Sequence, residues 1–577
     1  MLYRAAAAIS LGLIYSASGF SPAPIMQPRS AAAAISPLSA LRMDVTETVD
    51  MTGGEVRQNR ELFDEDLLKL GRRSRPTSID WSNLRARLEV EFKIPEDTLK
   101  KYDEIASEDL EKAYEMMQLC RQFENACNQA YMQGNIRGFM HLDNGQVRLL
   151  TLHSNKLAPA ARYTLSHAAL LFYSPPQETI PAWIADTIKK GDIKYSYYRE
   201  HTHAIASGVD SGAVMAELFA KDTGTCRGTG GSMHIYDVET HFQGGWALVS
   251  EQLPYAAGAA RSILLDRHLD PEGTKDDDRI SIVFIGEGGA QNGRMAECLN
   301  AAAKEKLPLL FIVIDNGRAI NTFTPDVAAN MDIFAQGEHY GVPGIKVDGG
   351  NLQDMMKTGR AVVDYVRETG PAIMQIHTYR FQGHSPADPE HERGRKAEKM
   401  WARAEADPIK LFEATDAANG LKLDEATARA KAEVKRAVEF AKASEPPPAS
   451  LAKELEFPDK PDTDYNAKAA PADGAAVTAA TVDPEALKTC EAHVEMLRGN
   501  AKDGTISIGD ALNLAILEEM LRDPKTTCHA EDLQAGSSYN IPKLTQQTFG
   551  SLRAADEIID EGHFIGKALG EGMNGYR

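Results

Sequence analysis

Cysteine is scarce in this sequence and shows no pattern. The six cysteines, at positions 120, 127, 226, 298, 490 and 528, have neither the spacing of a metal site nor that of a disulfide framework. Positive charge is also in short supply, because 83 acidic residues against 63 lysines and arginines leave a net charge of −20. That balance argues against nucleic acid as a partner. Beyond the amino terminus no apolar run is long enough to span a bilayer, so we expect no membrane anchor.

The amino-terminal segment has the composition of a targeting signal. Residues 1–19 contain one early arginine, an apolar run to Leu13 and small residues before Phe20, and they resemble a signal peptide. Residues 20–43 are rich in Ser, Pro and Ala without an acid, as transit peptides are. The combination resembles the bipartite targeting signal of algae with complex plastids, and it predicts a plastid location. A mitochondrial presequence is the alternative.

The rest of the chain is long enough for two or more domains, since 43% of the 577 residues are hydrophobic. Residues 44–109 are polar, and we expect solvated helix and loop there without chemistry. Residues 110–444 form the main globular region, whose last part is rich in Ala, Lys and Glu and predicts closing helices. Residues 445–484 hold too little large apolar surface to fold and predict a flexible linker. Residues 485–577 resume globular patterning, with Ser507 as an N-cap.

The stretch GEGGAQNGRMAECLNAAAKEKLPLLFIVIDN, which ends at Asn316, predicts a βαβ unit. Residues 279–285 and 307–314 are apolar and β-branched, as strands buried on both faces are, and 295–306 fits a crossover helix. Open α/β sheets bind ligands at the carboxyl ends of their strands. Backbone N–H groups at a helix start suit a diphosphate, and Glu287 with Asn316 offers oxygens to a hard cation. A glycine turn that only relieves a steric problem is the alternative.

This stretch resembles the thiamine diphosphate motif of 2-oxoacid dehydrogenases, a Gly-Asp-Gly followed at a fixed distance by Asn-Asn. The resemblance implies that magnesium is bound by Glu287, the side chain of Asn316 and the backbone carbonyl of Arg318. Two letters depart from it, because Glu287 stands in place of Asp and Asp315 in place of the first Asn. Magnesium requires near-octahedral geometry at about 2.0–2.1 Å, so the extra methylene of Glu287 puts its ligand role in question.

The resemblance extends from Leu110 to Pro408 and is to the alpha subunits of the first component of pyruvate dehydrogenase. Five further blocks carry it: IRGFMHLDNGQ, YYREHTHA, CRGTGGSMHIYD, GGWALVSEQLPYAAGAA and TYRFQGHSPADP. The resemblance implies a thiamine diphosphate-binding α/β fold, with a parallel sheet flanked by helices. It also implies that His141 lies beside the reacting carbon and that His384 faces the substrate. The implied cofactor-binding residues are Tyr198, Arg199, Ala247, Val249, Glu287, Gly288, Gly289, Asn316 and Arg380.

The activity that the resemblance implies is oxidative decarboxylation of pyruvate, with thiamine diphosphate and Mg2+ as cofactors. The acetyl group would pass to the lipoyl arm of an acyltransferase of the complex. GGSMH favours pyruvate or acetoin enzymes over branched-chain ones, and an acetoin or other 2-oxoacid dehydrogenase is the alternative. A catalytically impaired paralogue that binds cofactor or partner subunits is a third reading, suggested by Glu287, Asp315 and Ser250.

The carboxyl-terminal region has a second, shorter resemblance. Residues 505–533 resemble the start of the beta subunit of the same enzymes, which implies a partial second α/β domain of the transketolase-like pyrimidine-binding kind. In the closing segment Glu561 precedes glycines by five, nine and fourteen residues, as in beta subunits. The match implies a catalytic Glu561 that hydrogen-bonds the aminopyrimidine ring and moves its proton. A helix-start acid favoured by the macrodipole is the alternative.

The two resemblances together predict an alpha–beta fusion whose beta-like part is truncated at Arg577. A separate beta subunit or a missing beta domain would complete the site, in a homo- or hetero-oligomer.

Residues 147–177 interrupt the family pattern between its first two blocks. These 31 residues contain no Asp, Glu or Gly, and their removal joins Gln146 to Glu178 in the family's order. We interpret them as a retained in-frame intron. A genuine surface insertion is the alternative, which loop-closure entropy would tolerate at modest cost.

Overall fold

The computed structural model describes residues 80–136, 138, 140–142, 178–319, 322–380, 384–385, 403, 406–456, 473–537 and 539–577. The chain divides into two units, 1–63 and 64–577, and every described residue belongs to the second. The predicted signal peptide (1–19), the transit peptide (20–43) and the insertion (147–177) lie outside the described residues.

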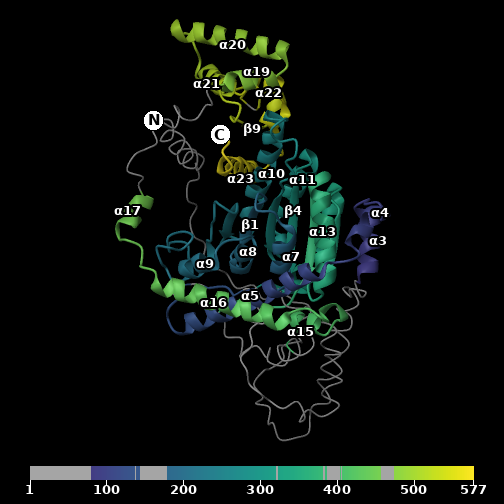
Figure 1. The fold of residues 1–577 in the computed structure, drawn as a ribbon. Helices are drawn as coiled ribbons and strands as arrows, with labels where there is room; N and C mark the ends of the chain where they lie inside the picture. Colours follow the sequence, from purple (N-terminus) through teal and green to yellow (C-terminus); the bar gives the residue numbers. More distant parts are fainter. Residues whose placement is uncertain are drawn as a thin grey trace, which may run out of the picture. The chain divides into compact units, whose positions relative to one another are not determined.

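A six-stranded parallel sheet organises the main region (Figure 1). Its strand order is β2-β1-β3-β4-β8-β7, and all neighbours pair in parallel. The strands are β1 (Ile193–Tyr197), β2 (Phe242–Trp246), β3 (Ser281–Gly286), β4 (Leu309–Asp315), β7 (Gly344–Asp348) and β8 (Ala372–His377). The two strands predicted at 279–285 and 307–314 are confirmed with a shift of one or two residues, and so is the α/β class.

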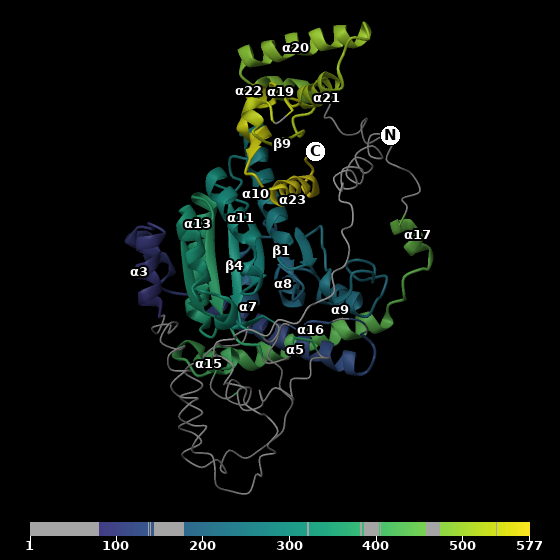
Figure 2. The same ribbon diagram turned by 180° about the vertical axis from the view of Figure 1, so that it is seen from behind.

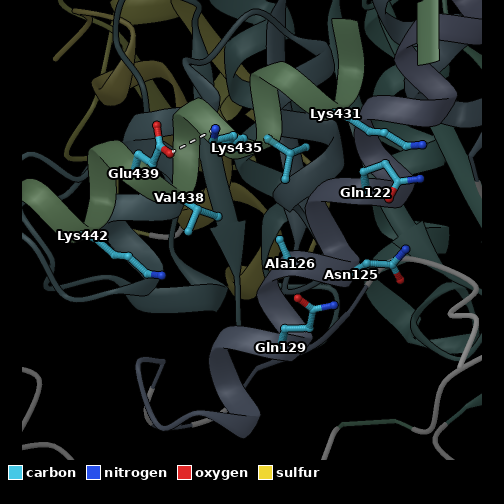
Figure 3. A pocket seen from close by; sticks show the side chains of 10 residues that line it. Gln122, Asn125, Ala126, Gln129, Lys431, Lys435, Val438, Glu439 and Lys442 are labelled. Carbon is cyan, nitrogen blue, oxygen red and sulfur yellow. Dashed lines mark ion pairs between the residues drawn. The ribbon is translucent and has the colours of Figure 1, made fainter. Parts of the chain in front are cut away.

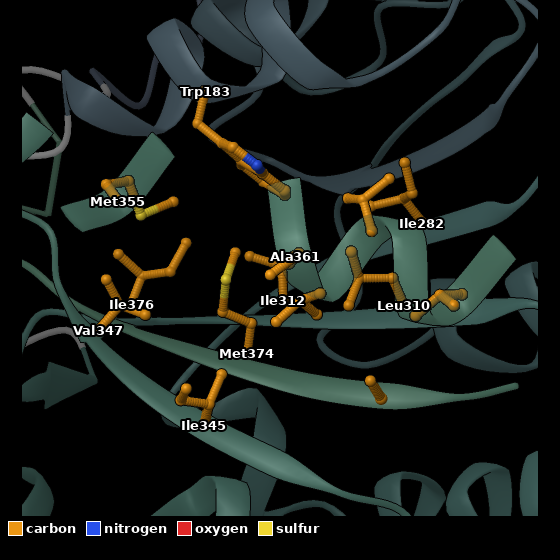
Figure 4. Close-up of a cluster of buried hydrophobic side chains, with 14 of the residues drawn as sticks. Trp183, Ile282, Leu310, Ile312, Ile345, Val347, Met355, Ala361, Met374 and Ile376 are labelled. Carbon is orange, nitrogen blue, oxygen red and sulfur yellow. The ribbon is translucent and has the colours of Figure 1, made fainter. Parts of the chain in front are cut away.

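The central strands are buried on both faces, as their apolar runs predict. Ile282 and Phe284 of β3 point into one core cluster, whereas Val283 and Ile285 point into a second on the opposite face. Figure 4 shows the first cluster, where side chains of the sheet meet Trp183. The helices that supply this first face are α3 (Trp81–Glu91), α7 (Thr179–Thr187) and α13 (Leu352–Glu368). Those of the second face are α10 (Gln252–Leu269) and α11 (Gly293–Glu305).

Further helices complete the main region. They are α5 (Ser107–Met132), α8 (His201–Ala206), α9 (Ser211–Leu218), α15 (Pro408–Glu413) and α16 (Leu423–Ala443). Figure 2 shows α5, α15 and α16 together below the sheet in that view. A buried ion group joins α5 to the starts of α7 and α15, because Arg121 of α5 donates to Glu178 at 2.5 Å and to both oxygens of Asp407 at 3.1 and 3.2 Å. Asp407 also caps α15. The closing helices predicted before Ser444 are thus present.

The polar extension predicted for residues 44–109 is wrong where the structure describes it. Leu84 and Leu88 of α3 are fully buried in the main core, and Phe92 stacks edge-on against Tyr365 with ring centroids 5.1 Å apart. The two leucines are four residues apart and so share one face of the helix. The polar average of this segment came from the opposite, exposed face. Short helix α4 (Glu96–Leu99) follows, and residues 44–79 lie outside the described residues.

The flexible linker predicted for residues 445–484 is also wrong at both of its ends. Helices α17 (Ser450–Glu456) and α19 (Gly474–Thr481) lie within it. Thr478 and Val482 are buried, and Val482 belongs to the core of the carboxyl-terminal region. The alanines that suggested a low-complexity tract are strong helix formers, and docking against a neighbouring helix needs only a few buried contacts. The Pro-rich stretch 457–472 lies outside the described residues.

The carboxyl-terminal region has its own small core around two parallel strands, β9 (Cys528–Glu531) and β10 (Ala554–Glu557). Its helices are α20 (Pro484–Lys502), α21 (Ile508–Arg522), α22 (Thr545–Arg553) and α23 (Glu561–Met573). Ser507 caps α21 as predicted, because its Oγ accepts the backbone N–H of Asp510 at 3.1 Å. Among the described residues, none of the helices combines the length and the apolar character needed to cross a membrane.

Candidate active site

The carboxyl ends of the parallel strands collect most of the predicted site residues at one edge of the sheet. Tyr198 and Arg199 follow β1, Ala247 follows β2, Glu287 follows β3 and Asn316 follows β4. Arg380 comes three residues after β8. The chain leaves β1 for β2 on one side and β3 lies on the other, so β1 and β3 flank a topological switch point. Ligands of open α/β sheets bind in the crevice at such a point.

Glu287 and Asn316 are in contact across this crevice. Glu287 is buried, and its Oε2 accepts hydrogen bonds from the backbone N–H and from Nδ2 of Asn316, both at 3.3 Å. Burial, together with the nearby charge of Asp315, raises the pKa of Glu287 to about 7. Arg318 lies two residues after Asn316, in the short strand β5 (Arg318–Ala319), which pairs with β6 (Thr322–Phe323).

These groups fit a hard cation in their chemistry. A carboxylate, an amide oxygen and a backbone carbonyl are the oxygen ligands that magnesium prefers. Nδ2 of Asn316 donates to Glu287 in this structure, so the side-chain amide must rotate before its oxygen can bind a cation that Glu287 also binds. A buried acid whose pKa is raised gains most from a nearby positive charge. The extra methylene of Glu287 does not prevent the contact with Asn316.

Asp315, the second departure from the family motif, is held by its own partners. Its Oδ2 accepts from Nε2 of Gln375 at 2.8 Å, and its Oδ1 accepts from the backbone N–H of Gly317 at 3.0 Å. Burial opposes ionisation of Asp315, but His377, whose Nδ1 lies 3.6 Å from Oδ2, leaves its pKa below the usual range. Sequence reasoning missed this support, because Gln375 and His377 belong to β8, a strand distant in the sequence. The substitution is therefore accommodated in the fold.

The glycines of the turn have a steric reason to be there. A Cβ on Gly288 would stand 2.6 Å from the Cβ of Ala319, and a Cβ on Gly289 would stand 2.8 Å from Cγ1 of Ile285. Ser250 donates its hydroxyl to the carbonyl of Gly289 at 2.8 Å, which joins this turn to the loop that holds Ala247 and Val249. The steric alternative therefore accounts for both glycines.

Aromatic and cationic side chains gather on the other side of the crevice. The ring of His141 lies 4.6 Å from that of Tyr198 and 4.9 Å from that of His384, measured between centroids. Arg199 joins the same segments, because it donates to the carbonyls of Leu142 at 2.7 Å and of His384 at 2.6 Å. Three blocks that are far apart in the sequence thus meet here.

His141 is held in its neutral form. Its burial, together with the positive charge of Arg199, lowers the pKa of His141 to about 3. Its Nδ1 is buried and has no hydrogen-bond partner among the described residues. The positive charge of Arg380 acts on both parts of the site, because it lowers the pKa of His141 and that of Glu287. A buried orphan nitrogen beside two arginines suits a polar, anionic ligand.

Glu561 is exposed and begins α23, whose N-cap Asp560 accepts the backbone N–H groups of Gly562 and His563. Among the described residues no hydrogen bond joins Glu561 to the other predicted site residues. Helix α23 packs on α10 in the same direction, with Gly566 against Pro254 and Glu571 against Arg261. The amino-terminal ends of the two helices therefore lie at the same end of the pair. The loop that holds Ala247 and Val249 leads into the amino-terminal end of α10. Glu561, at the amino-terminal end of α23, therefore lies at the same end of the α10–α23 pair as this loop.

A separate groove of about 410 Å³ lies between α5 and α16 (Figure 3). Lysines line it at positions 431, 435 and 442, and Lys435 pairs with Glu439 at 3.8 Å. Apart from the lysines and Glu439, its lining residues are amides and small apolar side chains. Histidine and cysteine are absent from this lining. The groove is built by helices alone and shares no residue with the strand-end crevice, so the candidate active site remains at the sheet edge.

Comparison with known proteins agrees with this geometry. Residues 166–450 match the family described as Dehydrogenase E1 component. The pyruvate dehydrogenase E1 component subunit alpha of Porphyra purpurea is 35% identical over 352 residues, which cover 60% of this chain and 92% of the relative. The chain belongs to the dehydrogenase E1 component family. Its relatives also include the chloroplastic subunit alpha-3 of Arabidopsis thaliana, 34% identical over 360 residues (62% and 76%), and the subunit alpha of Rickettsia felis, 30% identical over 351 residues (60% and 94%).

The range that matches the E1 family holds every predicted cofactor residue and His384, whereas His141 and Glu561 lie outside it. Sequence reasoning missed three buried side chains, of which only His201 stands in a quoted block: Glu124, His201 and Glu217. The block YYREHTHA contains two histidines, and the first of them was a usable signal for His201. The acids gave none, because glutamates on helices are usually solvated.

Proposed function

We propose that this E1 chain decarboxylates pyruvate with thiamine diphosphate and Mg2+, and passes the acetyl group to a lipoyl-bearing acyltransferase. The proposal is supported by two groups that follow the strands on either side of the switch point: the Glu287–Asn316 pair after β3 and β4, and the His141–Tyr198–His384 cluster, whose Tyr198 follows β1. Relatives named as pyruvate dehydrogenase alpha subunits support pyruvate as the substrate.

The two halves of the crevice suit the two ends of the cofactor. Bound thiamine diphosphate supplies the carbon nucleophile and the electron sink for decarboxylation. Arg199, Arg380 and Tyr198 would hold the diphosphate together with the backbone of Gly288 and Gly289. Arginine matches phosphate oxygens with two parallel hydrogen bonds.

Magnesium would take its ligands from the opposite wall, namely Glu287, Asn316 and the carbonyl of Arg318. The backbone at Ala247 and Val249 would hold the aminopyrimidine ring.

His141 and His384 would orient the substrate. Since the pKa of His141 is about 3, the ring stays neutral near pH 7 and acts as a hydrogen-bond partner, not as a proton donor. His384 touches the same ring edge-on and is itself held by Arg199. Water exclusion follows from burial of His141, Glu287 and Arg380.

Glu561 would hold the proton at the aminopyrimidine ring, as the match to beta subunits implies. The parallel packing of α10 and α23 supports this role, because it brings the start of α23 to the end of α10 that follows the Ala247 loop. We propose that residues 485–577 are beta-like and that a beta subunit or further beta domain completes the oligomer.

The proposed location is the plastid, reached through a bipartite signal in residues 1–43. Two chloroplastic relatives support the plastid, and the mitochondrial matrix is the alternative. A fluorescent protein carrying residues 1–43 should enter the plastid of an alga with a complex plastid, whereas one carrying residues 20–43 alone should stay outside. Entry of the shorter fusion would contradict the two-step signal.

The insertion at 147–177 remains a proposed retained intron. Sequencing of full-length transcripts across codons 146 to 178 tests it, because reads that contain the 31 codons as the major form would establish a genuine insertion.

The function itself is tested by calorimetry followed by turnover. The chain, supplied with a beta subunit, should bind thiamine diphosphate only when Mg2+ is present and should then release carbon dioxide from pyruvate. Faster turnover of acetoin or of a branched 2-oxoacid than of pyruvate would assign the alternative substrate. Absence of any cofactor binding would establish the impaired paralogue instead.

A further inference from the structure

A chain of hydrogen bonds runs through the buried interior behind His141. Oε1 of Glu124 lies 2.7 Å from Nδ1 of His201, and Nε2 of His201 lies 2.8 Å from Oγ of Ser232. Ser232 Oγ in turn accepts the backbone N–H of His141 at 3.3 Å. Glu124 and His201 are fully buried and Ser232 is 5% exposed. The chain thus connects helix α5, helix α8 and the loop before β2 to the backbone of the predicted substrate-orienting histidine.

The direction of each hydrogen bond follows from the chemistry of the groups. A carboxylate only accepts, so Nδ1 of His201 carries the proton shared with Glu124. In the tautomer that carries its proton on Nδ1, Nε2 accepts the hydroxyl proton of Ser232. The oxygen of Ser232 keeps a lone pair for the N–H of His141. Every donor is used once, which fixes the rotamer of the serine and the tautomer of the histidine.

Glu217 of α9 fixes the loop from which Ser232 comes. Its Oε2 accepts the backbone N–H groups of Cys226 and Gly228 at 2.8 and 2.9 Å. Its Oε1 accepts those of Gly230 and Gly231 at 2.7 and 3.0 Å. A carboxylate that accepts charge-assisted bonds from a whole loop is a strong anchor. Ser232 follows this anchored loop directly, so Glu217 fixes the position of the serine relative to the backbone of His141.

The Glu–His–Ser order is that of a hydrolase triad, but the surroundings rule out that use here. An attacking serine needs an oxyanion hole of free N–H groups. The N–H groups of Gly230 and Gly231, which precede the serine, are bound to Glu217. The hydroxyl oxygen itself is bound to His141.

A metal ion does not suit this cluster either. Glu124, Cys127 and His201 could offer ligand atoms within 4.8 Å of one another, yet both ring nitrogens of His201 are already hydrogen-bonded.

We propose that Glu124, His201 and Ser232, anchored by Glu217, are positioning residues that hold His141 against Tyr198 and His384. The inference rests on the proposed function, because it assigns these groups a part in orienting the substrate of that site. Removal of the serine hydroxyl leaves the backbone of His141 without its acceptor and lets the ring leave the cluster. A misplacement of about 1 Å at a reacting centre lowers the rate by about 100-fold.

Hydrogen exchange measured by mass spectrometry tests the positioning without turnover. In the full chain, Ser232→Ala should speed exchange of the backbone amide of His141 by about tenfold or more, because the hydrogen bond that protects it is lost. Thr229→Ala is the matched control, since it removes a hydroxyl from the same loop that bonds only the carbonyl of Cys226. Equal exchange at His141 in the two variants would overturn the proposal.

Turnover with a supplied beta subunit then asks whether positioning matters to the reaction. Ser232→Ala and Glu124→Ala should lower kcat for pyruvate by about 10- to 100-fold with KM nearly unchanged. Glu124→Gln should recover most of the loss, because its amide oxygen can still accept from Nδ1 of His201.

The outcomes are separable from failure of the proposed function. Faster exchange with undiminished kcat would overturn the role in catalysis, and equal loss in Glu124→Gln and Glu124→Ala would do the same. If the unaltered chain and Thr229→Ala are both inactive, the proposed function fails while the exchange result still decides the positioning. Should Ser232→Ala not fold, Glu124→Gln and Glu124→Ala carry the same comparison.

Discussion

Gly258 of α10 faces the carbonyl oxygen of Lys567 in α23 so closely that no side chain fits between them. A Cβ on Gly258 would stand 2.0 Å from that oxygen, and a Cβ on Gly570 would stand 2.2 Å from the carbonyl oxygen of Tyr255. The two helices therefore touch backbone to backbone through small residues on both sides. Two of the three glycines spaced after Glu561 have this close approach as their physical reason, namely Gly566 against Pro254 and Gly570 against Tyr255, whereas Gly575 has a positive φ of 92° and nothing within 4 Å.

Gly258→Ala should separate α23 from α10. Inserting a methyl group into a full contact costs about 1–3 kcal/mol, and the docked carboxyl-terminal region should lose about that much stability. Chemical denaturation followed at Tyr576, whose hydroxyl bonds Asp266 of α10, would report the loss. Gly499→Ala is the control, because nothing lies within 4 Å of the added carbon and helix propensity should stabilise α20 by up to about 1 kcal/mol. A neutral Gly258→Ala would show that the helices do not touch in solution.

Arg261→Met should lower the free energy of unfolding more than the loss of a surface arginine does. Arg261 is fully buried and donates to Glu571 at 2.7 Å and to Glu305 at 2.8 Å. Removing it takes this partner from the buried Glu571 and the half-buried Glu305, which costs about 3–5 kcal/mol. The control is Arg429→Met, whose pairs with Glu111 and Glu115 are exposed to solvent and should therefore contribute much less to stability. The urea midpoints of both variants, measured at one pH, compare their losses of stability. Equal losses in Arg261→Met and Arg429→Met would contradict a stabilising role of the buried network.

The same network should make docking of the carboxyl-terminal region pH-dependent. His529 of β9 lies 2.6 Å from Glu557 of β10 and 3.0 Å from Glu571 of α23. Arg261 and Lys567 are the other cations of the group, and Glu305 of α11 is the third acid. Burial opposes the charge on His529, but the two carboxylates leave its pKa above the usual value. With His529 protonated, the buried cations and anions balance.

The sign of the pH effect follows from that raised pKa. The folded state holds the proton more tightly than the unfolded state, so the stabilisation is complete below about pH 6.5 and disappears as pH rises through the folded pKa. Thermal unfolding between pH 6 and pH 9 should show Tm falling with pH in the unaltered chain. His529→Gln should be less stable at pH 6 and should lack this part of the slope. An unchanged slope in the variant would assign the pH dependence to other groups.

The sequence predicted the sheet and the position of the crevice because both depend on local pattern. Apolar β-branched runs mark β3 and β4, and the residues just after each parallel strand meet at one edge whatever the details of packing. It failed at α3 and at α19, where one buried face on an otherwise polar or alanine-rich segment decides the fold. The Glu124–His201 and Asp315–Gln375 contacts were invisible for another reason. Each joins residues brought together only by the completed tertiary structure.

Proton release should accompany magnesium binding at Glu287. Burial and the charge of Asp315 raise the pKa of this acid to about 7, and a cation binds only the ionised carboxylate. Affinity for Mg2+ should therefore fall by about tenfold for each pH unit below 7 and level off above it. Calorimetry in two buffers of different ionisation enthalpy, at pH 6 and pH 8, measures both the affinity and the proton released.

Variants of two acids separate Glu287 from other groups that titrate in this range. Glu287→Gln should bind Mg2+ more weakly and with little dependence on pH, since the titrating ligand is gone. Glu297 of α11 is the matched control, because burial and Asp560 raise its pKa to about 7 as well, away from Asn316. Glu297→Gln should keep the full pH dependence of the unaltered chain. If the dependence survives in Glu287→Gln or vanishes in Glu297→Gln, the metal is bound elsewhere, because a ligand's proton must compete directly with the ion that replaces it.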